Sequence, residues 1–293
     1  MIVPPERAGY PAPPDLSERR AQMVAGLAAG VWATARPPVE TALGGRRTLR
    51  FIPEGLPRGH VLHLHGGGYR LGCPEIEGPF AERIAAACGV EVVCPEYRLA
   101  PEHPFPAGFN DAWAALAALR DEIGDAPLIV SGDSAGGGLA AAVALRAAKA
   151  GAPRVDGVML MSAWLDLTVS ADAFARNAAS DPMFSRQSAQ VAAGLYLQGA
   201  DPLHPLASPV LAPLAGFPPT LISVGTGEVL ADDAIAFHDR LRAAGAACEL
   251  AAINGMDHVA VTRGADLPGS AETFARIAAF VDRLMTIRPA ALR

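Results

Sequence analysis

The chain has 293 residues, of which 51% are hydrophobic and 18% charged, and its formal net charge is −6. This composition is typical of a packed globular protein and excludes an intrinsically disordered chain. The charge is mild and spread along the sequence without a basic stripe, so nucleic acid is not expected as a partner.

Strand-like and helix-like segments alternate along most of the chain. The first helical pattern covers Ser17–Thr34, with Ser17 as a candidate cap. Near-continuous apolar strands separated by helices predict an α/β fold, with a mostly parallel sheet covered on both faces. The predicted strands are Arg47–Ile52, His60–His65, Val90–Pro95, Pro127–Ser131, Val155–Ser162, Thr220–Val224 and Cys248–Ile253. The predicted helices after the first are Pro79–Cys88, Asn110–Ile123, Gly136–Ala150, Asp232–Ala244 and Ser270–Met285.

The interval 166–218 interrupts this alternation, because it is rich in proline and contains no clear strand. A long excursion between two strands of a compact sheet is usually functional, for example a lid. We therefore predict a cap inserted at about 166–218, which packs with the N-terminal helix over the serine motif described next. The predicted division is an N-terminal cap segment, 1–45, and a catalytic domain, 46–293, that carries this insertion.

Two glycine-rich motifs each follow a predicted strand. Gly132–Gly136 has the form G-x-S-x-G, in which Ser134 would stand on a sharp strand-to-helix turn as a nucleophile. His65–Tyr69 contains the HGGG loop that supplies backbone N–H groups to an oxyanion hole in lipases and esterases. The elbow geometry assigns one oxyanion donor to Ala135, and the loop offers Gly67 and Gly68. Together the motifs predict a serine acyl hydrolase, with His65 as an anchor of the loop.

A serine nucleophile needs a base, and in α/β-hydrolases the chain order is serine, acid, histidine. His258 follows the last predicted strand in a glycine-containing loop, where this fold places its histidine. Glu228 follows the penultimate strand and is the predicted acid. Asp232 is its main rival, although Asp232 and Asp233 at a helix start are more simply explained as a cap or as charges that complement the helix dipole.

The motifs resemble those of the hormone-sensitive-lipase-like bacterial esterases, from about residue 58 to the end of the chain. The similarity includes the loop 65–69, the elbow 132–137, the segment 96–107 and the later Ser162–Leu167 and Ala207–Pro209. The resemblance implies an α/β-hydrolase fold with an N-terminal cap, and hydrolysis of short-chain carboxylic esters without a cofactor or metal. The family acid is most often Asp in a D-P-L pattern, whereas this chain has Glu228-Val229-Leu230.

The same residues are compatible with two alternative functions. A lactone or amide hydrolase would use the same Ser134–His258–Glu228 triad, since all three substrates pass through a similar oxyanion. A non-catalytic binding protein on this fold is a remote alternative, because such a protein would be expected to lack part of the triad.

The sequence also predicts a cytoplasmic protein without membrane partners. It shows no signal-peptide pattern, no apolar run long enough to span a membrane and no paired cysteine spacing. The sequence leaves the oligomeric state open, a homodimer included.

Overall fold

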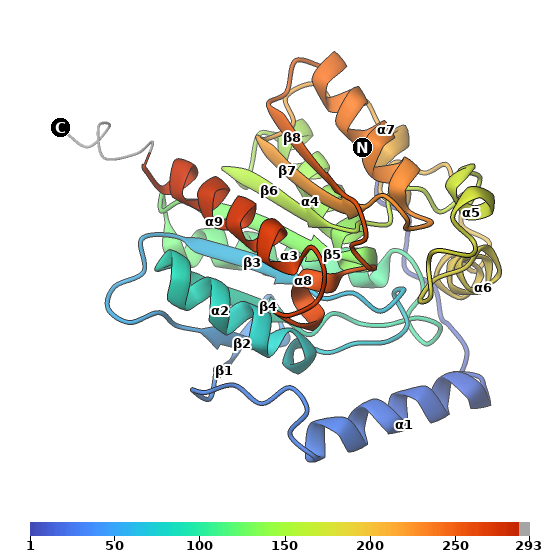
Figure 1. Ribbon diagram of the computed structural model, residues 1–293, viewed down its shortest axis with the longest axis horizontal. Coiled ribbons are helices and arrows are strands. Elements are labelled where there is room, and N and C mark those ends of the chain that lie inside the picture. Colours follow the sequence, from blue (N-terminus) through green and yellow to red (C-terminus); the bar gives the residue numbers. More distant parts are fainter. Residues whose placement is uncertain (287–293) are drawn as a thin grey trace.

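A single eight-stranded sheet forms the centre of the computed structural model, which describes residues 1–286 (Figure 1). The strand order is β1-β2-β4-β3-β5-β6-β7-β8. β1 pairs antiparallel with β2, and β2 antiparallel with β4, whereas every other pairing is parallel. The strands are β1 (Val39–Leu43), β2 (Arg46–Phe51), β3 (His60–Leu64), β4 (Glu91–Pro95), β5 (Leu128–Asp133), β6 (Gly157–Met161), β7 (Thr220–Gly225) and β8 (Cys248–Ile253).

Helices cover both faces of this sheet, as predicted. One face packs against α3, α4 and α7, and the other against α2, α8 and α9. Figure 1 shows α2 and α9 in front of the sheet and α3 and α4 behind it. The helices are α1 (Pro14–Ala28), α2 (Gly78–Cys88), α3 (Ala107–Ile123), α4 (Ser134–Ala150), α5 (Ala173–Arg176), α6 (Arg186–Leu197), α7 (Ala231–Ala243), α8 (Ala260–Arg263) and α9 (Ser270–Thr286), with short 3₁₀ turns at Pro74–Glu77 and Pro209–Leu211.

The central strands β5, β6 and β7 are buried at every position, because each face of the sheet packs against a different core. In β5, Leu128 and Val130 pack in the core beside α3 and α4, whereas Ile129 packs beside α2 and α9. Successive side chains of a strand point to opposite faces, so a strand buried on both sides shows a continuous apolar run instead of an alternating one. The predicted α/β class with a mostly parallel sheet is confirmed.

The structure differs from the prediction at two elements near the N-terminus. The first helix covers Pro14–Ala28 instead of Ser17–Thr34, and Pro14 occupies its first turn, where the missing N–H of proline has no intrahelical partner to lose. Ser17 lies inside the helix and is not its cap. The strand β1 was not predicted, because most of its residues are exposed at the sheet edge and it lacks an apolar alternation.

The segment 166–218 contains α5 and α6 and, over these described residues, no strand. Residues 287–293 of the predicted domain lie outside the described residues.

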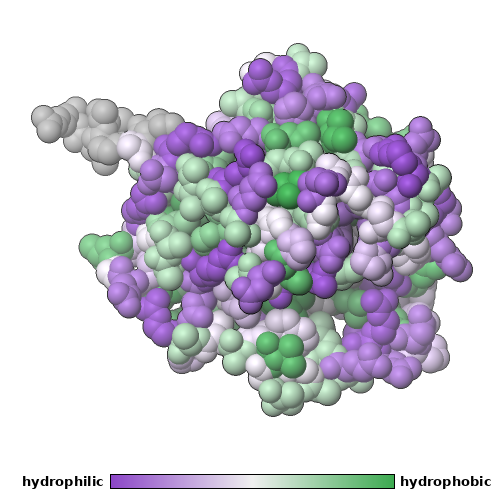
Figure 2. Space-filling model, in the orientation of Figure 1, coloured by the Kyte–Doolittle hydropathy of each residue, from purple (hydrophilic) through white to green (hydrophobic). Residues whose placement is uncertain are grey.

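Within residues 1–286, no helix is both long and apolar enough to cross a bilayer. On the face seen in Figure 2, strongly hydrophobic residues are scattered among hydrophilic ones. Scattered apolar residues are usual on a folded protein surface and do not by themselves mark an interface.

Candidate active site

Ser134 stands at the junction between β5 and α4, at the carboxyl end of the parallel strands. Its φ of +48° is unusual for a residue with a Cβ and marks a sharp, strained turn. The turn is closely packed against the β3 end: a Cβ on Gly136 would lie 2.0 Å from the carbonyl oxygen of Leu64. Glycine is therefore required at this position, and the turn presents Ser134 at the N-terminus of α4.

Ser134, His258 and Glu228 form one continuous chain of hydrogen bonds. His258 Nε2 lies 3.1 Å from Ser134 Oγ, and His258 Nδ1 lies 2.7 Å from Glu228 Oε2. The three residues follow β5, β8 and β7, whose parallel carboxyl ends meet at one edge of the sheet. The structure thus brings together the three residues that the motifs and the chain order predicted.

The protein surroundings of His258 favour its protonated form more than bulk water would. Burial alone would lower the pKa of His258, but the hydrogen bond and the negative charge of Glu228 outweigh burial and raise the pKa above its ordinary value of 6.5. Glu228 is only 1% exposed, so its charge is weakly screened. A carboxylate in this position also holds Nδ1 protonated and leaves Nε2 free to accept a proton from Ser134.

Ser162 holds the acid and the histidine loop together, and sequence reasoning did not assign it this role. Its Oγ donates to Glu228 Oε1 at 2.8 Å and accepts the Val259 N–H at 3.1 Å. Asp181 accepts the Val229 N–H at 2.9 Å, so the insertion also contacts the segment that carries the acid. The only available sequence signal was the position of Ser162 directly after β6, within a segment that resembles a family motif.

The carboxylates of Asp232 and Asp233 bind groups other than His258. Asp232 Oδ2 accepts the Ala173 N–H at 2.8 Å and its carboxylate pairs with Arg176, so Asp232 anchors α5. Asp233 Oδ2 accepts the backbone N–H groups of Leu165 and Asp166. Neither residue caps α7, which begins at Ala231 without a side-chain cap. The capping interpretation was wrong, because contacts across the chain occupy both carboxylates.

The HGGG loop borders the same cavity as Ser134. Gly67 and Gly68 line it, with positive φ angles of 109° and 62°. A Cβ on Gly67 would lie 2.2 Å from the carbonyl oxygen of Leu71, so this position also requires glycine. Ala135 is the residue after Ser134 in the first turn of α4, where backbone N–H groups have no intrahelical partner.

His65 belongs to the support of this loop and is not joined to Ser134. Its Nδ1 lies 2.7 Å from the Gly66 carbonyl oxygen, and its ring stacks on Tyr97 at 4.2 Å between centroids. Tyr97 in turn donates from its hydroxyl to the His65 carbonyl oxygen at 2.7 Å. These contacts agree with the anchoring role expected from the sequence.

A second group of ionisable side chains lies buried beneath the elbow. Within residues 1–286, His63, Glu77 and Asp133 are one set whose ligating atoms lie close enough to hold a metal ion, within 4.8 Å of one another. Burial raises the pKa of Glu77 to about 8, and burial together with Glu77 raises that of Asp133 to about 8. Burial lowers the pKa of His63 to about 4. All three shifts favour the uncharged forms of these buried groups. The absence of a metal stays a prediction.

The cavity beside Ser134 has a volume of about 190 Å³. Its walls come from both predicted cap regions, through Arg19 of α1 and through Met183, Phe184 and Ser188 of the insertion. The Phe184 ring lies nearly parallel to the His258 ring, at 6.1 Å between centroids.

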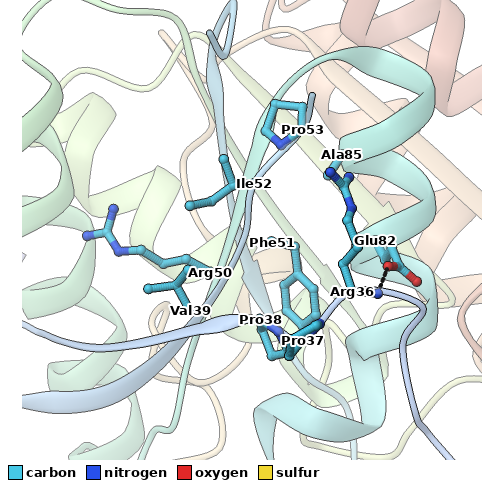
Figure 3. Close-up of a pocket in the computed structure, with 10 residues that line it drawn as sticks. All are labelled: Arg36, Pro37, Pro38, Val39, Arg50, Phe51, Ile52, Pro53, Glu82 and Ala85. Carbon is cyan, nitrogen blue, oxygen red and sulfur yellow. Dashed lines mark hydrogen bonds between the residues drawn. The ribbon is translucent and has the colours of Figure 1, made fainter. Parts of the chain in front are cut away.

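A separate pocket of about 220 Å³ lies between the segment before β1, the end of β2 and the middle of α2 (Figure 3). Two of its charged residues already have partners: Arg50 pairs with Glu91 and Glu122, and Glu82 accepts the backbone N–H groups of residues 35 and 36. None of the predicted site residues lines this pocket, so the chemistry is concentrated at the cavity beside Ser134.

A mostly parallel sheet with a serine, a carboxylate and a histidine at its carboxyl edge is the arrangement of the α/β hydrolases. The chain belongs to this family, since the family described as the alpha/beta hydrolase fold matches residues 61–262.

Related proteins place the chain more narrowly. It is 37% identical to an acetyl-hydrolase of Streptomyces hygroscopicus over 71% of each chain. It is 34% identical to the carboxylesterase NlhH of Mycobacterium tuberculosis, over 77% of this chain and 73% of the relative. A crystal structure of an esterase from the bacterial hormone-sensitive lipase family superposes with a TM-score of 0.86 at 32% identity, covering 94% of this chain and 93% of the other. The resemblance to hormone-sensitive-lipase-like esterases is confirmed.

Proposed function

We propose that the protein is a serine carboxylesterase that hydrolyses short-chain carboxylic esters. Ser134 is the nucleophile, His258 the general base and Glu228 the acid that orients it. The N–H groups of Gly67, Gly68 and Ala135 form the oxyanion hole.

The observation that carries this proposal is the hydrogen-bond chain from Ser134 through His258 to Glu228, which ends at a cavity bordered by the HGGG loop. The names of the relatives, acetyl-hydrolase and carboxylesterase, favour esters over lactones and amides for the same triad.

The reaction follows from this geometry in two half-reactions. His258 Nε2 takes the proton of Ser134 Oγ while the oxygen attacks the ester carbonyl carbon. The carbonyl oxygen becomes negative and is stabilised by N–H groups that are already in place, which include the first turn of α4 with its positive dipole end. The intermediate collapses, His258 returns the proton to the leaving alcohol, and the acyl group remains on Ser134. Water then attacks the acyl-enzyme by the same steps and releases the acid.

The size of the cavity favours substrates with short acyl chains. A volume of about 190 Å³ lies below the range of about 300–1,000 Å³ that is common for drug-sized ligands. Two regions outside the sheet contribute to its walls, Arg19 from α1 and Met183–Ser188 from the insertion. We infer that the segment 1–45 and the insertion at about 166–218 act as a cap that limits the length of the acyl chain.

The experiment is a rate measurement combined with covalent labelling. The purified protein is expected to release p-nitrophenol from p-nitrophenyl butyrate, and a fluorophosphonate probe is expected to modify the peptide that contains Ser134. A panel that adds a lactone and an anilide separates the ester reading from its alternatives. Labelling of a different residue, or faster turnover of the lactone or anilide than of every ester, would contradict the proposal.

We also propose a cytoplasmic location. The four cysteines, Cys73, Cys88, Cys94 and Cys248, are free thiols, as expected in a reducing compartment. Cell fractionation tests the location, and light scattering on the purified protein distinguishes a monomer from a homodimer.

A further inference from the structure

Two arginines face the cavity beside Ser134 without a carboxylate partner. Arg70 and Arg19 both line it. Arg70 is only 8% exposed, and its Nε is buried without a hydrogen-bond partner. Within residues 1–286, neither guanidinium forms an ion pair, whereas the neighbouring Arg20 is bound to Glu102 at 2.6 Å.

Arg70 lies beside the loop that would bind the reacting end of a substrate. It follows the oxyanion loop by two residues, and a Cβ placed on Gly68 would lie 3.6 Å from its Nε. The Arg70 guanidinium therefore stands beside the loop that would hold the ester carbonyl. Its backbone is fixed as well, since the Arg70 N–H donates to the Gly67 carbonyl oxygen and the Arg70 carbonyl oxygen accepts from Arg20.

The local electrostatics leave this positive charge uncompensated. Burial and the nearby Arg19 lower the pKa of Arg70, and the charge of Asp15 opposes them only in part. Asp133 also lines the cavity, but burial and Glu77 raise its pKa to about 8, which favours its uncharged form. A buried cation without a partner is unfavourable, and an anion brought by a ligand would relieve this cost.

We propose that the cavity selects esters that carry a carboxylate, with Arg70 as the residue that binds this carboxylate and Arg19 as an auxiliary positive charge. This inference rests on the proposed esterase function and specifies its substrate class. The guanidinium has unused N–H donors arranged as a planar fork, which suits a carboxylate better than it suits a neutral acyl chain. The small cavity keeps the carboxylate within a few carbons of the ester bond.

The test uses matched pairs of substrates that differ only in charge. Mono-p-nitrophenyl adipate is compared with its methyl ester, which places the carboxylate on the acyl side. The pair 4-butyryloxybenzoate and methyl 4-butyryloxybenzoate places it on the alcohol side. In at least one pair the charged member is expected to have a kcat/KM at least tenfold higher, mainly through a lower KM, and the preference is expected to shrink in 0.5 M salt.

Variants then assign the preference to Arg70. Arg70→Gln is expected to reduce the charged-to-neutral ratio about tenfold or more, Arg70→Lys to retain most of it, and Arg19→Gln to reduce it less. Arg242→Gln removes an exposed arginine of α7 and serves as the control, with an unchanged ratio. Competitive inhibition of the wild-type protein by hexanoate, compared with 1-hexanol, needs no variant and is expected to favour the anion.

The outcomes separate this inference from the proposed function. Hydrolysis of the neutral esters without a preference for either charged member, or a preference that survives in Arg70→Gln, would overturn the carboxylate inference alone. Failure to hydrolyse any of the four esters, with p-nitrophenyl butyrate also unreactive, would overturn the esterase proposal itself.

Discussion

Glu228→Gln tests the role of the acid, because it keeps the side-chain shape and removes its charge. In the native site the carboxylate accepts from His258 Nδ1 at 2.7 Å and from Ser162 Oγ at 2.8 Å. Glutamine can still accept from Ser162 with its carbonyl oxygen. Its amide N–H₂ group then faces His258 and donates to Nδ1, so the imidazole proton moves to Nε2. An Nε2 that carries a proton cannot accept one from Ser134.

The expected decrease in kcat for Glu228→Gln has two causes: the imidazole adopts the wrong tautomer, and the negative charge beside it is lost. Comparable substitutions in catalytic triads predict a decrease in kcat of about 10²- to 10⁴-fold. This corresponds to about 2.7–5.4 kcal/mol of transition-state stabilisation, at about 1.36 kcal/mol for each factor of ten. Glu228→Asp is expected to be milder, because the charge remains and only the reach becomes shorter.

The assay is the steady-state hydrolysis of p-nitrophenyl butyrate, with circular dichroism to verify folding. Asp232→Asn is the matched control: it is expected to keep near-wild-type kcat and to lose about 1 kcal/mol of stability, because Asp232 holds the Ala173 N–H and Arg176 of α5. An inactive Asp232→Asn together with an active Glu228→Gln would refute the reasoning and transfer the acid role to Asp232.

Three further predictions concern the same site. Because His258 must be neutral to accept the proton of Ser134 and its pKa is raised, kcat/KM is expected to increase with pH through an apparent pKa above 6.5. In Glu228→Gln this pKa is expected to fall, because burial alone lowers it; an unchanged pH profile would contradict this. Ser162→Ala is expected to lower kcat about tenfold with little change in KM, since Glu228 and the Val259 N–H both lose a partner. The C4 p-nitrophenyl ester is expected to exceed the C12 ester in kcat/KM, and a fivefold advantage for C12 would contradict the small cavity.

The parts of the site that depend on local geometry could be predicted from the sequence. Ser134 lies in a motif whose glycines are required by contacts with the adjacent strand, and the structure has a Cβ-intolerant position at Gly136. His258 and Glu228 could be found because parallel strands end at one edge of the sheet, so residues just after β8 and β7 come close to the residue after β5.

The remaining parts depend on contacts between distant segments, which the linear sequence does not display. Ser162 acts through Glu228, 66 residues later in the chain, and Asp232 is occupied by residues of the insertion. The lack of an ion-pair partner for Arg70 can be recognised only once the fold has brought α1 and the HGGG loop to the same cavity. The edge strand β1 lacked a pattern because it borders only one neighbouring strand and is largely exposed.

Ser134→Ala tests the central claim most directly, because alanine suits the turn and only the nucleophile is removed. The measurement is the rate of p-nitrophenyl butyrate hydrolysis by the folded variant, with Ser170→Ala, an exposed serine in the insertion, as the control. We predict a loss on the order of 10⁴-fold or more for Ser134→Ala and near-wild-type activity for the control. A folded Ser134→Ala variant that retained near-wild-type turnover would contradict the assignment of Ser134 as the nucleophile and, with it, the proposed mechanism.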